Sequence, residues 1–385
     1  MTFVYSSSTV FRTETSSTVR GTLPTANDSS ISTDLVAWNK FSNLLKKSSN
    51  GGSYSSQTLV STYTLARTNQ SGSYIGGVLG LDETIYFIPY SMDGYPAQKV
   101  NPDGTVSTYS LIYGTHQHNN FFGGVLAPNG DIHFIPHNAE VGQKISANGV
   151  VSTYSLVYTG SSAYAGGVVG ANGDIHFIPA LAAVGQKISA AGVVSTYSLL
   201  QSSTTSIQYL GGVLAPNGDI HFVNYAAPRG QKVSAAGVVS TYSLVHTRTN
   251  AAYFGGVLSP NGEIIFIQYV SGALVRGQKI SINGTVSTFS MLNKDYAGGV
   301  LAANGDIHFV PYTATVGQKL SVDGVISTYN IPYTLITGTY LGGVAKTNGE
   351  IHFVPHNAAV GTKITTNPGI PWTKGIALSP YFNKL

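Results

Sequence analysis

The chain has 385 residues, of which only 9% are charged, with a formal net charge of +4 and no cysteine. Disulfides are therefore excluded, and because Lys and Arg form no cluster suited to phosphates, we expect no nucleic-acid binding. No apolar run approaches the ~18 residues of a membrane span, so we expect no membrane insertion. The first residues, MTFVYSSSTVFRTETSSTVRG, lack the apolar segment of a signal peptide.

The first 51 residues differ in character from all that follow. Residues 1 to about 31 are rich in Ser and Thr without periodicity, which predicts an irregular arm. From Asp34 to Lys47 apolar residues recur at helical spacing, and Asn50-Gly51 would end the helix. Its apolar face would consist of Leu35, Trp38, Phe41, Leu44 and Leu45. This face either packs on the rest of the chain or anchors the protein to a partner through Leu35, Trp38 and Phe41.

A repeated unit organises the remainder of the chain. The triplet Gly-Gly-Val recurs at intervals of 43 to 47 residues, beginning at Gly76, Gly123, Gly166, Gly211, Gly255, Gly298 and Gly342. A fixed period of this size indicates a solenoid, an array or a propeller. The copy from Gly123 to Leu156 contains short β-type runs separated by turns at Asn129-Gly130 and Asn148-Gly149. Four strands per unit match one propeller blade.

The two ends of the array indicate a closed ring. The fourth-strand motif Val-Ser-Thr-Tyr occurs at Val60, before the first triplet, and is missing after the last triplet at Gly342. The early strand, from about Thr58 to Leu65, must therefore complete the last blade, which removes exposed sheet edges. We predict an all-β, seven-bladed β-propeller over residues 52–368, with residues 369–385 as a C-terminal tail packed on the ring.

Two sets of polar residues recur in the blades. An acid precedes the second strand and a Lys lies in the third, as in Asp131 and Lys144, which suits an ion pair across a hairpin worth about 0.2–1 kcal/mol. A His lies at the centre of the second strand in five blades, as His133, His176, His221, His308 and His352. Copies spread around a ring are unsuited to a metal site, so we expect a hydrogen-bonded His between blades.

The connections that differ among blades all belong to one face. The links from the second to the third strand, and from each blade to the next, are long and variable, whereas the other turns are short and constant. Variable loops on a rigid scaffold are typical of a binding surface. The candidate ligand-binding residues of this face also include His116, His118 and the Thr247-Arg248 pair.

Aromatic residues form two sets near this face. The first set consists of the aromatic residue two positions before each Gly-Gly pair. The second set lies at the end of the second strand of each repeated unit. The first set is Tyr74, Phe121, Tyr164, Tyr209, Tyr253, Tyr296 and Tyr340. The second is Tyr90, His137, Tyr225, Tyr269, Tyr312 and His356, with Ala180 as the exception. Each set either packs between blades or binds a sugar or protein partner; the second set completes our list of candidate ligand-binding residues.

The sequence contains no convincing catalytic or metal-binding arrangement. Carboxylates of the variable links are limited to Asp93, Glu140 and Asp295, from three separate blades, so no close acid pair is expected. There is no Gly-x-Ser-x-Gly motif and no cysteine nucleophile. His116 and His118 have no further ligand nearby in sequence. We expect no catalytic residues, no metal and no cofactor.

The unit NGDIHF…GQKISANGVVSTYSL resembles the blades of seven-bladed propellers of the virginiamycin B lyase type, over about residues 58 to 368. The resemblance implies the fold. It does not carry the lyase activity, because that family's metal-binding acid and catalytic His have no identifiable counterparts here. The similar blades, the Ser/Thr-rich arm and the low charge also resemble, in style, propeller proteins of phage particles.

Our leading hypothesis is a non-enzymatic structural and recognition subunit of a virus particle, in a phage tail, tail fibre or capsid-decoration role. The arm would bind other virion proteins, and the variable face would bind host glycan or a neighbouring subunit. One alternative is a soluble or secreted, hence extracellular, lectin with several equivalent sites. Another is a propeller lyase or hydrolase.

Overall fold

The structure is a computed structural model that describes residues 58–66, 72–90, 96–112, 119–245, 252–269, 275–332 and 336–366. The expected arm, the helix with Leu35, Trp38 and Phe41, and the C-terminal tail lie outside the described residues. Within the described ranges, no helix is long and apolar enough to cross a membrane.

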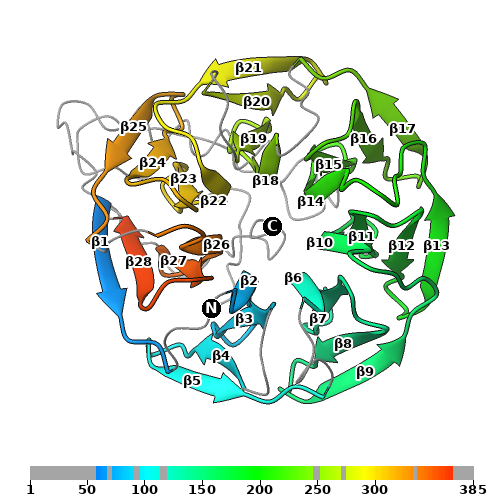
Figure 1. The fold of residues 1–385 in the computed structure, drawn as a ribbon, viewed down its shortest axis with the longest axis horizontal. Helices are drawn as coiled ribbons and strands as arrows, with labels where there is room; N and C mark the ends of the chain where they lie inside the picture. Colours follow the sequence, from blue (N-terminus) through cyan, green and yellow to red (C-terminus); the bar gives the residue numbers. More distant parts are fainter. Residues whose placement is uncertain are drawn as a thin grey trace, which may run out of the picture. The chain divides into compact units, whose positions relative to one another are not determined.

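The described residues form seven four-stranded antiparallel sheets, arranged as blades around a central axis (Figure 1). We number the blades from blade 1, which contains β2, to blade 7, which contains β26. Each blade runs from an innermost strand at the axis to an outer strand at the circumference (Figure 1). The prediction of an all-β, seven-bladed propeller is confirmed.

The strands occupy four equivalent positions in the blades. The innermost strands are β2 (Tyr74–Leu79), β6 (Phe121–Leu126), β10 (Tyr164–Val169), β14 (Tyr209–Leu214), β18 (Tyr253–Leu258), β22 (Tyr296–Leu301) and β26 (Tyr340–Ala345). The second strands are β3 (Ile85–Pro89), β7 (Ile132–Pro136), β11 (Ile175–Pro179), β15 (Ile220–Asn224), β19 (Ile264–Gln268), β23 (Ile307–Pro311) and β27 (Glu350–Pro355). The third strands are β4 (Ala97–Val100), β8 (Val141–Ile145), β12 (Val184–Ile188), β16 (Gly230–Val233), β20 (Arg276–Ile280), β24 (Gly317–Leu320) and β28 (Gly361–Thr366). The outer strands are β5 (Val106–Tyr109), β9 (Val151–Ser155), β13 (Val194–Ser198), β17 (Val239–Tyr242), β21 (Val286–Ser290), β25 (Ile326–Tyr329) and β1 (Thr58–Tyr63).

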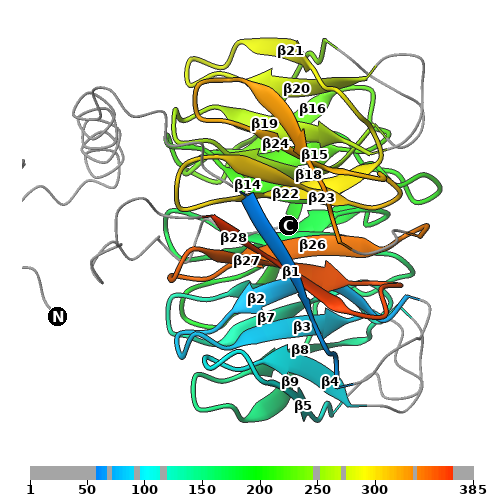
Figure 2. The ribbon, with the colours of Figure 1, turned by 90° about the vertical axis from the view of Figure 1, so that its left-hand side faces the viewer.

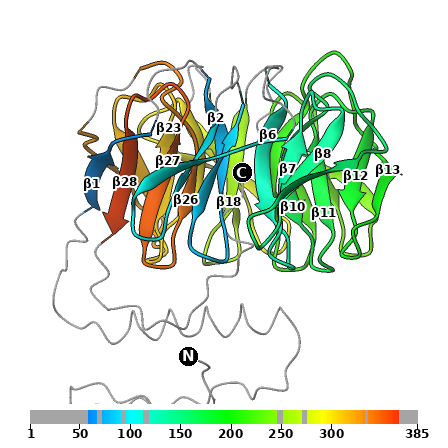
Figure 3. The ribbon, with the colours of Figure 1, turned by 90° about the horizontal axis from the view of Figure 1, so that it is seen from below.

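The ring is closed by pairing the first described strand with the last. β1 runs antiparallel to β28, from Thr58 opposite Thr366 to Tyr63 opposite Gly361. Figures 2 and 3 show the two strands side by side, although they come from opposite ends of the described chain. The predicted closure is confirmed, because β1 supplies the outer strand that blade 7 lacks in its own sequence.

The constant turns follow from glycine conformation. At the turn between β6 and β7, the Gly130 amide donates to the Ala127 carbonyl oxygen (2.9 Å), and Asn129 Oδ1 accepts from the Asp131 amide (3.1 Å). Gly130 has a φ of 88°, which residues with a Cβ rarely adopt. The predicted Asn-Gly turns are therefore confirmed as tight hairpin connections.

The two glycines of the repeated triplet have different roles. Gly123 has a φ of 83°, and the pairing of β6 with β7 shifts register between Phe121 and Gly124, so the innermost strand bulges there. A Cβ added at Gly124 would lie 2.9 Å from Ile88 Cδ1 of the preceding blade. The triplet thus bends the innermost strand and lets neighbouring blades approach closely.

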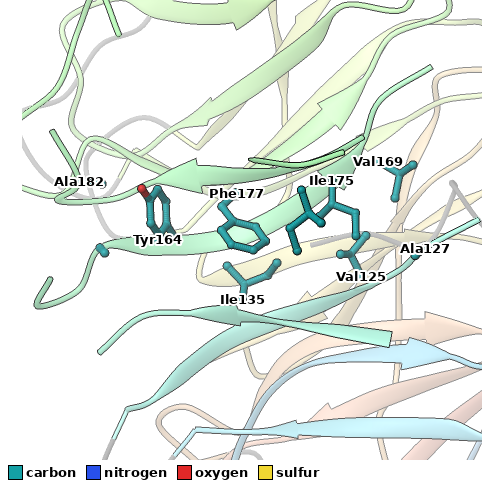
Figure 4. Close-up of a cluster of buried hydrophobic side chains, with 10 residues drawn as sticks. Val125, Ala127, Ile135, Tyr164, Val169, Ile175, Phe177 and Ala182 are labelled. Carbon is teal, nitrogen blue, oxygen red and sulfur yellow. The ribbon is translucent and has the colours of Figure 1, made fainter. Parts of the chain in front are cut away.

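Stability comes from many small cores rather than one large one. Each of the seven junctions between neighbouring blades contains its own buried apolar cluster. Figure 4 shows the junction of blades 2 and 3, where Ile135 of β7 faces Phe177 of β11 and both are fully buried. Fully burying one such side chain stabilises by about 1.5–3 kcal/mol, so the scaffold is held together wherever blades meet.

Candidate functional site

The variable face is the end of the propeller that carries the links from second to third strands and from blade to blade. Parts of these links, with His116, His118, Thr247 and Arg248, lie outside the described residues. The described residues of this face nevertheless include every member of the second aromatic set. They gather in one cluster with residues of the innermost strands, and these strands surround the axis (Figure 1).

An apolar floor closes the axis near this face. Each blade contributes the residue between the conserved aromatic and the Gly-Gly pair of its innermost strand. These seven residues are Ile75, Phe122, Ala165, Leu210, Phe254, Ala297 and Leu341. Phe122 and Phe254 come from blades 2 and 5, which are not neighbours, yet their ring centroids are only 5.9 Å apart. The floor residues therefore meet across the axis.

The second aromatic set forms a rim around this floor. We call the floor and the rim together the axial cluster. Its rim members are Tyr90, His137, Ala180, Tyr225, Tyr269, Tyr312 and His356. Tyr269 lies 4.8 Å from Phe254 and 5.0 Å from Tyr312, measured between ring centroids, and Phe122 lies 5.2 Å from His137. The six predicted aromatic residues are thus brought together, and whether they bind a ligand stays a prediction.

The four rim tyrosines bring hydrogen-bonding hydroxyl groups to the axial cluster. Burial raises the pKa of Tyr90 and of Tyr225, and the nearby Tyr312 raises both further. Burial also raises the pKa of Tyr269, followed by a side-chain hydrogen bond with Tyr312. All four side chains remain half-buried rather than buried. The hydroxyl groups of Tyr90, Tyr225 and Tyr269 are neutral near pH 7, and the four side chains are partly accessible.

The two rim histidines are fixed in one tautomer. Nδ1 of His137 lies 2.9 Å from the Tyr164 carbonyl oxygen, and Nδ1 of His356 lies 2.9 Å from that of Tyr74. A carbonyl oxygen can only accept, so each Nδ1 carries the proton and each Nε2 carries a lone pair. Burial lowers the pKa of both imidazoles, although the carbonyl contacts oppose this. Both side chains are neutral acceptors near pH 7.

Asp295 supplies a carboxylate beside this group. Its backbone has a φ of 73°, a left-handed conformation that is uncommon for residues other than glycine, and its carbonyl oxygen accepts from the Tyr312 amide (3.0 Å). The negative charge of Asp295 contributes to the raised pKa of Tyr269. The described polar groups of the axial cluster can therefore donate and accept hydrogen bonds, and none of them is a Lys or Arg.

The first aromatic set is structural. Its seven members are at most 2% exposed, and each packs on the Phe of its own second strand, as Tyr164 does on Phe177 (5.6 Å between ring centroids). The Tyr164 hydroxyl donates to the Val184 carbonyl oxygen (3.2 Å). Of the two interpretations left open by the sequence, packing is confirmed for this set.

The prediction that the second-strand histidines hydrogen-bond between blades is wrong, because their hydrogen-bond partner lies in the same blade. Nδ1 of His133 lies 3.2 Å from the hydroxyl of Tyr154, which belongs to the outer strand of the same blade. The same pair recurs in three further blades at 3.2 to 3.4 Å, and in blade 7 its tyrosine is Tyr63 of the closing strand. Blade 5 has Ile265 and Phe289 at the two positions, within one apolar cluster. In blade 5 both members of the polar pair are therefore replaced together, whereas blade 1 replaces the His alone, with Tyr86, and keeps the tyrosine as Tyr109.

The predicted ion pairs are present in six blades. Nζ of the third-strand Lys lies 2.5 to 2.8 Å from the carboxylate in each, as in Lys144 with Asp131 (2.7 Å). In blade 1, Lys99 instead lies over the ring of Tyr86, 5.6 Å from its centroid. These repeated charges belong to the scaffold.

A repeated glutamine connects the blades, and our sequence reasoning missed it. Gln186 Oε1 of blade 3 accepts from the amides of Val157 (3.0 Å) and Tyr158 (2.7 Å), which follow the outer strand of blade 2. Gln143, Gln231, Gln278 and Gln318 accept from the preceding link in the same way. The signal was available, since this Gln recurs before the Lys of the third strand and is fully buried.

Among the described residues, no group of three or more His, Cys, Asp or Glu side chains is placed to hold a metal ion. His116 and His118, the sequence candidates for such a group, are not among those residues.

Comparison with known proteins supports the fold alone. No family model matches the chain, and no curated protein does. A solved structure of catalytically inactive virginiamycin B lyase from Staphylococcus aureus with quinupristin is 17% identical, with a TM-score of 0.67 over 80% of this chain and 99% of that one. A streptogramin B lyase is 18% identical with the same TM-score over 80% and 98% of the two chains. Hydrazine synthase from Kuenenia stuttgartiensis is 10% identical, with a TM-score of 0.58 over 78% and 98%. The expected likeness to the lyase propeller is thus confirmed as a likeness of fold.

Proposed function

We propose that this protein is a non-enzymatic recognition module that binds its ligand at the axial cluster of the variable face. The observation that supports this proposal is the rim itself. Half-buried tyrosines and two neutral histidines from six blades converge over an apolar floor. Aromatic residues with one apolar and one polar side are typical of binding hot spots.

Variation among otherwise similar blades supports the same site. The second-strand Phe is present and fully buried in all seven blades, from Phe87 to Phe353. The rim position holds Tyr, His or Ala, and the floor position holds Ile, Phe, Ala or Leu. Packing that is common to all blades cannot require a residue that changes from blade to blade. The axial positions are therefore free to serve a ligand.

The setting that we propose is a virus particle, with the module as a structural and recognition subunit of a phage tail, fibre or capsid decoration. The Ser/Thr-rich N-terminal arm would bind other virion proteins, and the axial cluster would bind a host glycan or a neighbouring subunit. Low overall charge and nearly identical blades support a rigid particle-borne scaffold. Assembly of a chain lacking residues 1–50 into its particle would count against this setting.

Binding to host cells tests the module itself. Labelled full-length protein and labelled residues 52–385 would be titrated against candidate host cells and a glycan panel. We expect saturable binding by both, weakened in Tyr225→Ala and Tyr269→Ala. Val157→Ala is the matched control, because Val157 is 62% exposed and follows an outer strand, away from the axis. Equal binding by all variants would exclude the axial cluster as the site.

The same titration separates the two alternative functions. One site per chain supports a single axial site, whereas several similar sites would support the multivalent lectin. Turnover that is abolished by a chelator or by substitution of His116 would instead support a lyase or hydrolase.

A further inference from the structure

We infer that the axial cluster binds one neutral sugar ring, with the apolar face of the sugar on the aromatic side chains and its hydroxyl groups on the tyrosine and histidine rim. This inference rests on the proposed function and narrows its ligand to a chemical class. Three features of the axial cluster support it: the floor closes the axis, the rim residues are uncharged, and apolar rings lie beside hydrogen-bonding groups.

The closed axis limits the shape of the ligand. Phe122 and Phe254 meet across the axis, and the other floor residues Ile75, Leu210 and Leu341 are at most 5% exposed. A polymer cannot thread through the ring past this contact. The ligand must therefore approach from the variable face and rest on the half-buried rim tyrosines above this buried floor, as a terminal or side-branch unit would.

The rim selects against charged ligands. The hydroxyls of Tyr90, Tyr225 and Tyr269 are neutral near pH 7, as tyrosines ordinarily are, and burial raises their pKa values further. His137 and His356 are also neutral there, because burial lowers their pKa values. The Asp295 carboxylate near Tyr269 would repel an anion. Among the described residues, the cluster and the adjacent Asp295 thus offer no cation to an anionic ligand, and one carboxylate to a cationic one.

The rim also supplies the hydrogen-bond donors and acceptors that sugar hydroxyls require. A sugar hydroxyl both donates and accepts, as a tyrosine hydroxyl does. The Nε2 atom of the half-buried His356 can accept from such a hydroxyl because its Nδ1 is engaged by a carbonyl oxygen, whereas His137, engaged in the same way, is only 5% exposed. Rings such as Tyr90, which lies 5.9 Å from Phe122 between centroids, provide the flat apolar surface against which the C–H face of a sugar packs.

The test is a titration of the full chain with single sugars. The probes are the methyl glycosides of glucose, galactose, mannose and N-acetylglucosamine, with N-acetylneuraminic acid as the anionic and glucosamine as the cationic comparison. Calorimetry and ligand-observed NMR would report affinity and stoichiometry. We expect one neutral glycoside to bind with one site per chain. Removing one hydroxyl by Tyr90→Phe or Tyr269→Phe should weaken binding by about threefold to tenfold, which is the worth of one hydrogen bond.

Tyr158→Phe is the matched control. Tyr158 lies in the link after an outer strand and packs at a blade junction, outside the axial cluster. Its hydroxyl accepts from the Ala183 amide (3.4 Å), so removing that hydroxyl should leave sugar affinity unchanged. The inference is overturned if no neutral glycoside binds, if a charged sugar binds more tightly, or if the two rim variants bind as the native chain does. Host-cell binding that requires Tyr225 but is not inhibited by any of these sugars would overturn the sugar and leave the proposed function standing.

Discussion

The junctions between blades and the axial cluster are built from neighbouring residues of the same strands, yet they differ in kind. In β6, Phe121 is 1% exposed and packs on Phe134, whereas the next residue, Phe122, reaches the axis and touches the rim. The junction residue is aromatic in every blade, and the axial residue varies from Ala to Phe. The comparison indicates that the junctions are fixed by packing, whereas the axial positions accept different residues from blade to blade, as the proposed binding site would require.

The largest expected effect breaks the ring itself. Removal of residues 1–66 deletes β1 and leaves β28 with an unpaired edge, at which Tyr63 no longer reaches His352. Because an exposed edge strand invites association between chains, we expect aggregation or loss of cooperative unfolding. Light scattering and thermal unfolding would show it, with removal of residues 1–51 as the control. A monomeric chain with unchanged unfolding would contradict the role of the closing strand.

Acid should destabilise the scaffold at a pH above the range in which ordinary carboxylates become protonated. Burial lowers the pKa of His133, His176 and His221 to about 4, below the ordinary value of about 6.5 that each has when unfolded. The unfolded chain therefore binds more protons between these values, so stability is complete above about pH 6.5 and falls as the pH approaches 4. Each His should contribute up to about 1.4 kcal/mol per pH unit, measured by urea unfolding. An unfolding free energy that does not change between pH 7 and pH 5 would contradict this prediction.

A cavity at a junction between blades should lower the unfolding free energy nearly as much as acid does. Phe177→Ala removes a fully buried ring from the cluster shown in Figure 4, and we expect a loss of about 3–5 kcal/mol of unfolding free energy. Tyr225→Ala should cost much less, since Tyr225 is half-buried at the axis. Denaturant unfolding of both variants sharpens the comparison, and equal losses would argue that the axis is packed like a junction.

The His–Tyr pair should behave as a unit. We expect His133→Ile or Tyr154→Phe alone to cost about 1–3 kcal/mol, because each leaves a buried polar partner unsatisfied. The double variant, which copies Ile265 and Phe289 of blade 5, should recover most of that loss. It should also bind one proton fewer during acid unfolding. Additive losses in a double-mutant cycle would contradict the coupling.

The smallest expected effect belongs to the ion pairs. Lys144 keeps a third of its side chain exposed, so Lys144→Met should cost about 0.2–1 kcal/mol and less at high salt. The corresponding change in blade 1, Lys99→Met, is the comparison, because Lys99 lies over Tyr86. A loss above about 2 kcal/mol would show that the pair does more than an exposed ion pair does.

The repeat made most of the fold predictable. Seven near-copies revealed the turns at Gly130 and Gly149, the pairing of Asp131 with Lys144, and the borrowed strand at Val60. The axial floor was not predicted, because the bulge at Gly123 interrupts the simple alternation of side chains along the innermost strand.

The missed contacts depend on where strands lie in space. His133 was assigned a partner in another blade because its true partner, Tyr154, is 21 residues away on a strand that is not adjacent to β7 in the sheet. The role of Gln186 depends on how the link after blade 2 passes over the third strand of blade 3, which no pattern within one repeat contains. The position of the rim residues could be predicted because each follows the second strand of its own blade, whereas their role in binding stays a prediction.

The most direct test of the account measures binding and stability on the same variant. Tyr225→Ala removes a rim side chain that the junctions do not use, and it would be compared with native protein for host-cell binding and for urea unfolding. We expect host-cell binding to be weakened while the unfolding free energy falls by no more than about 1–2 kcal/mol. Binding that is retained in a clearly destabilised protein would contradict it, because the axial cluster would then be one more packed core.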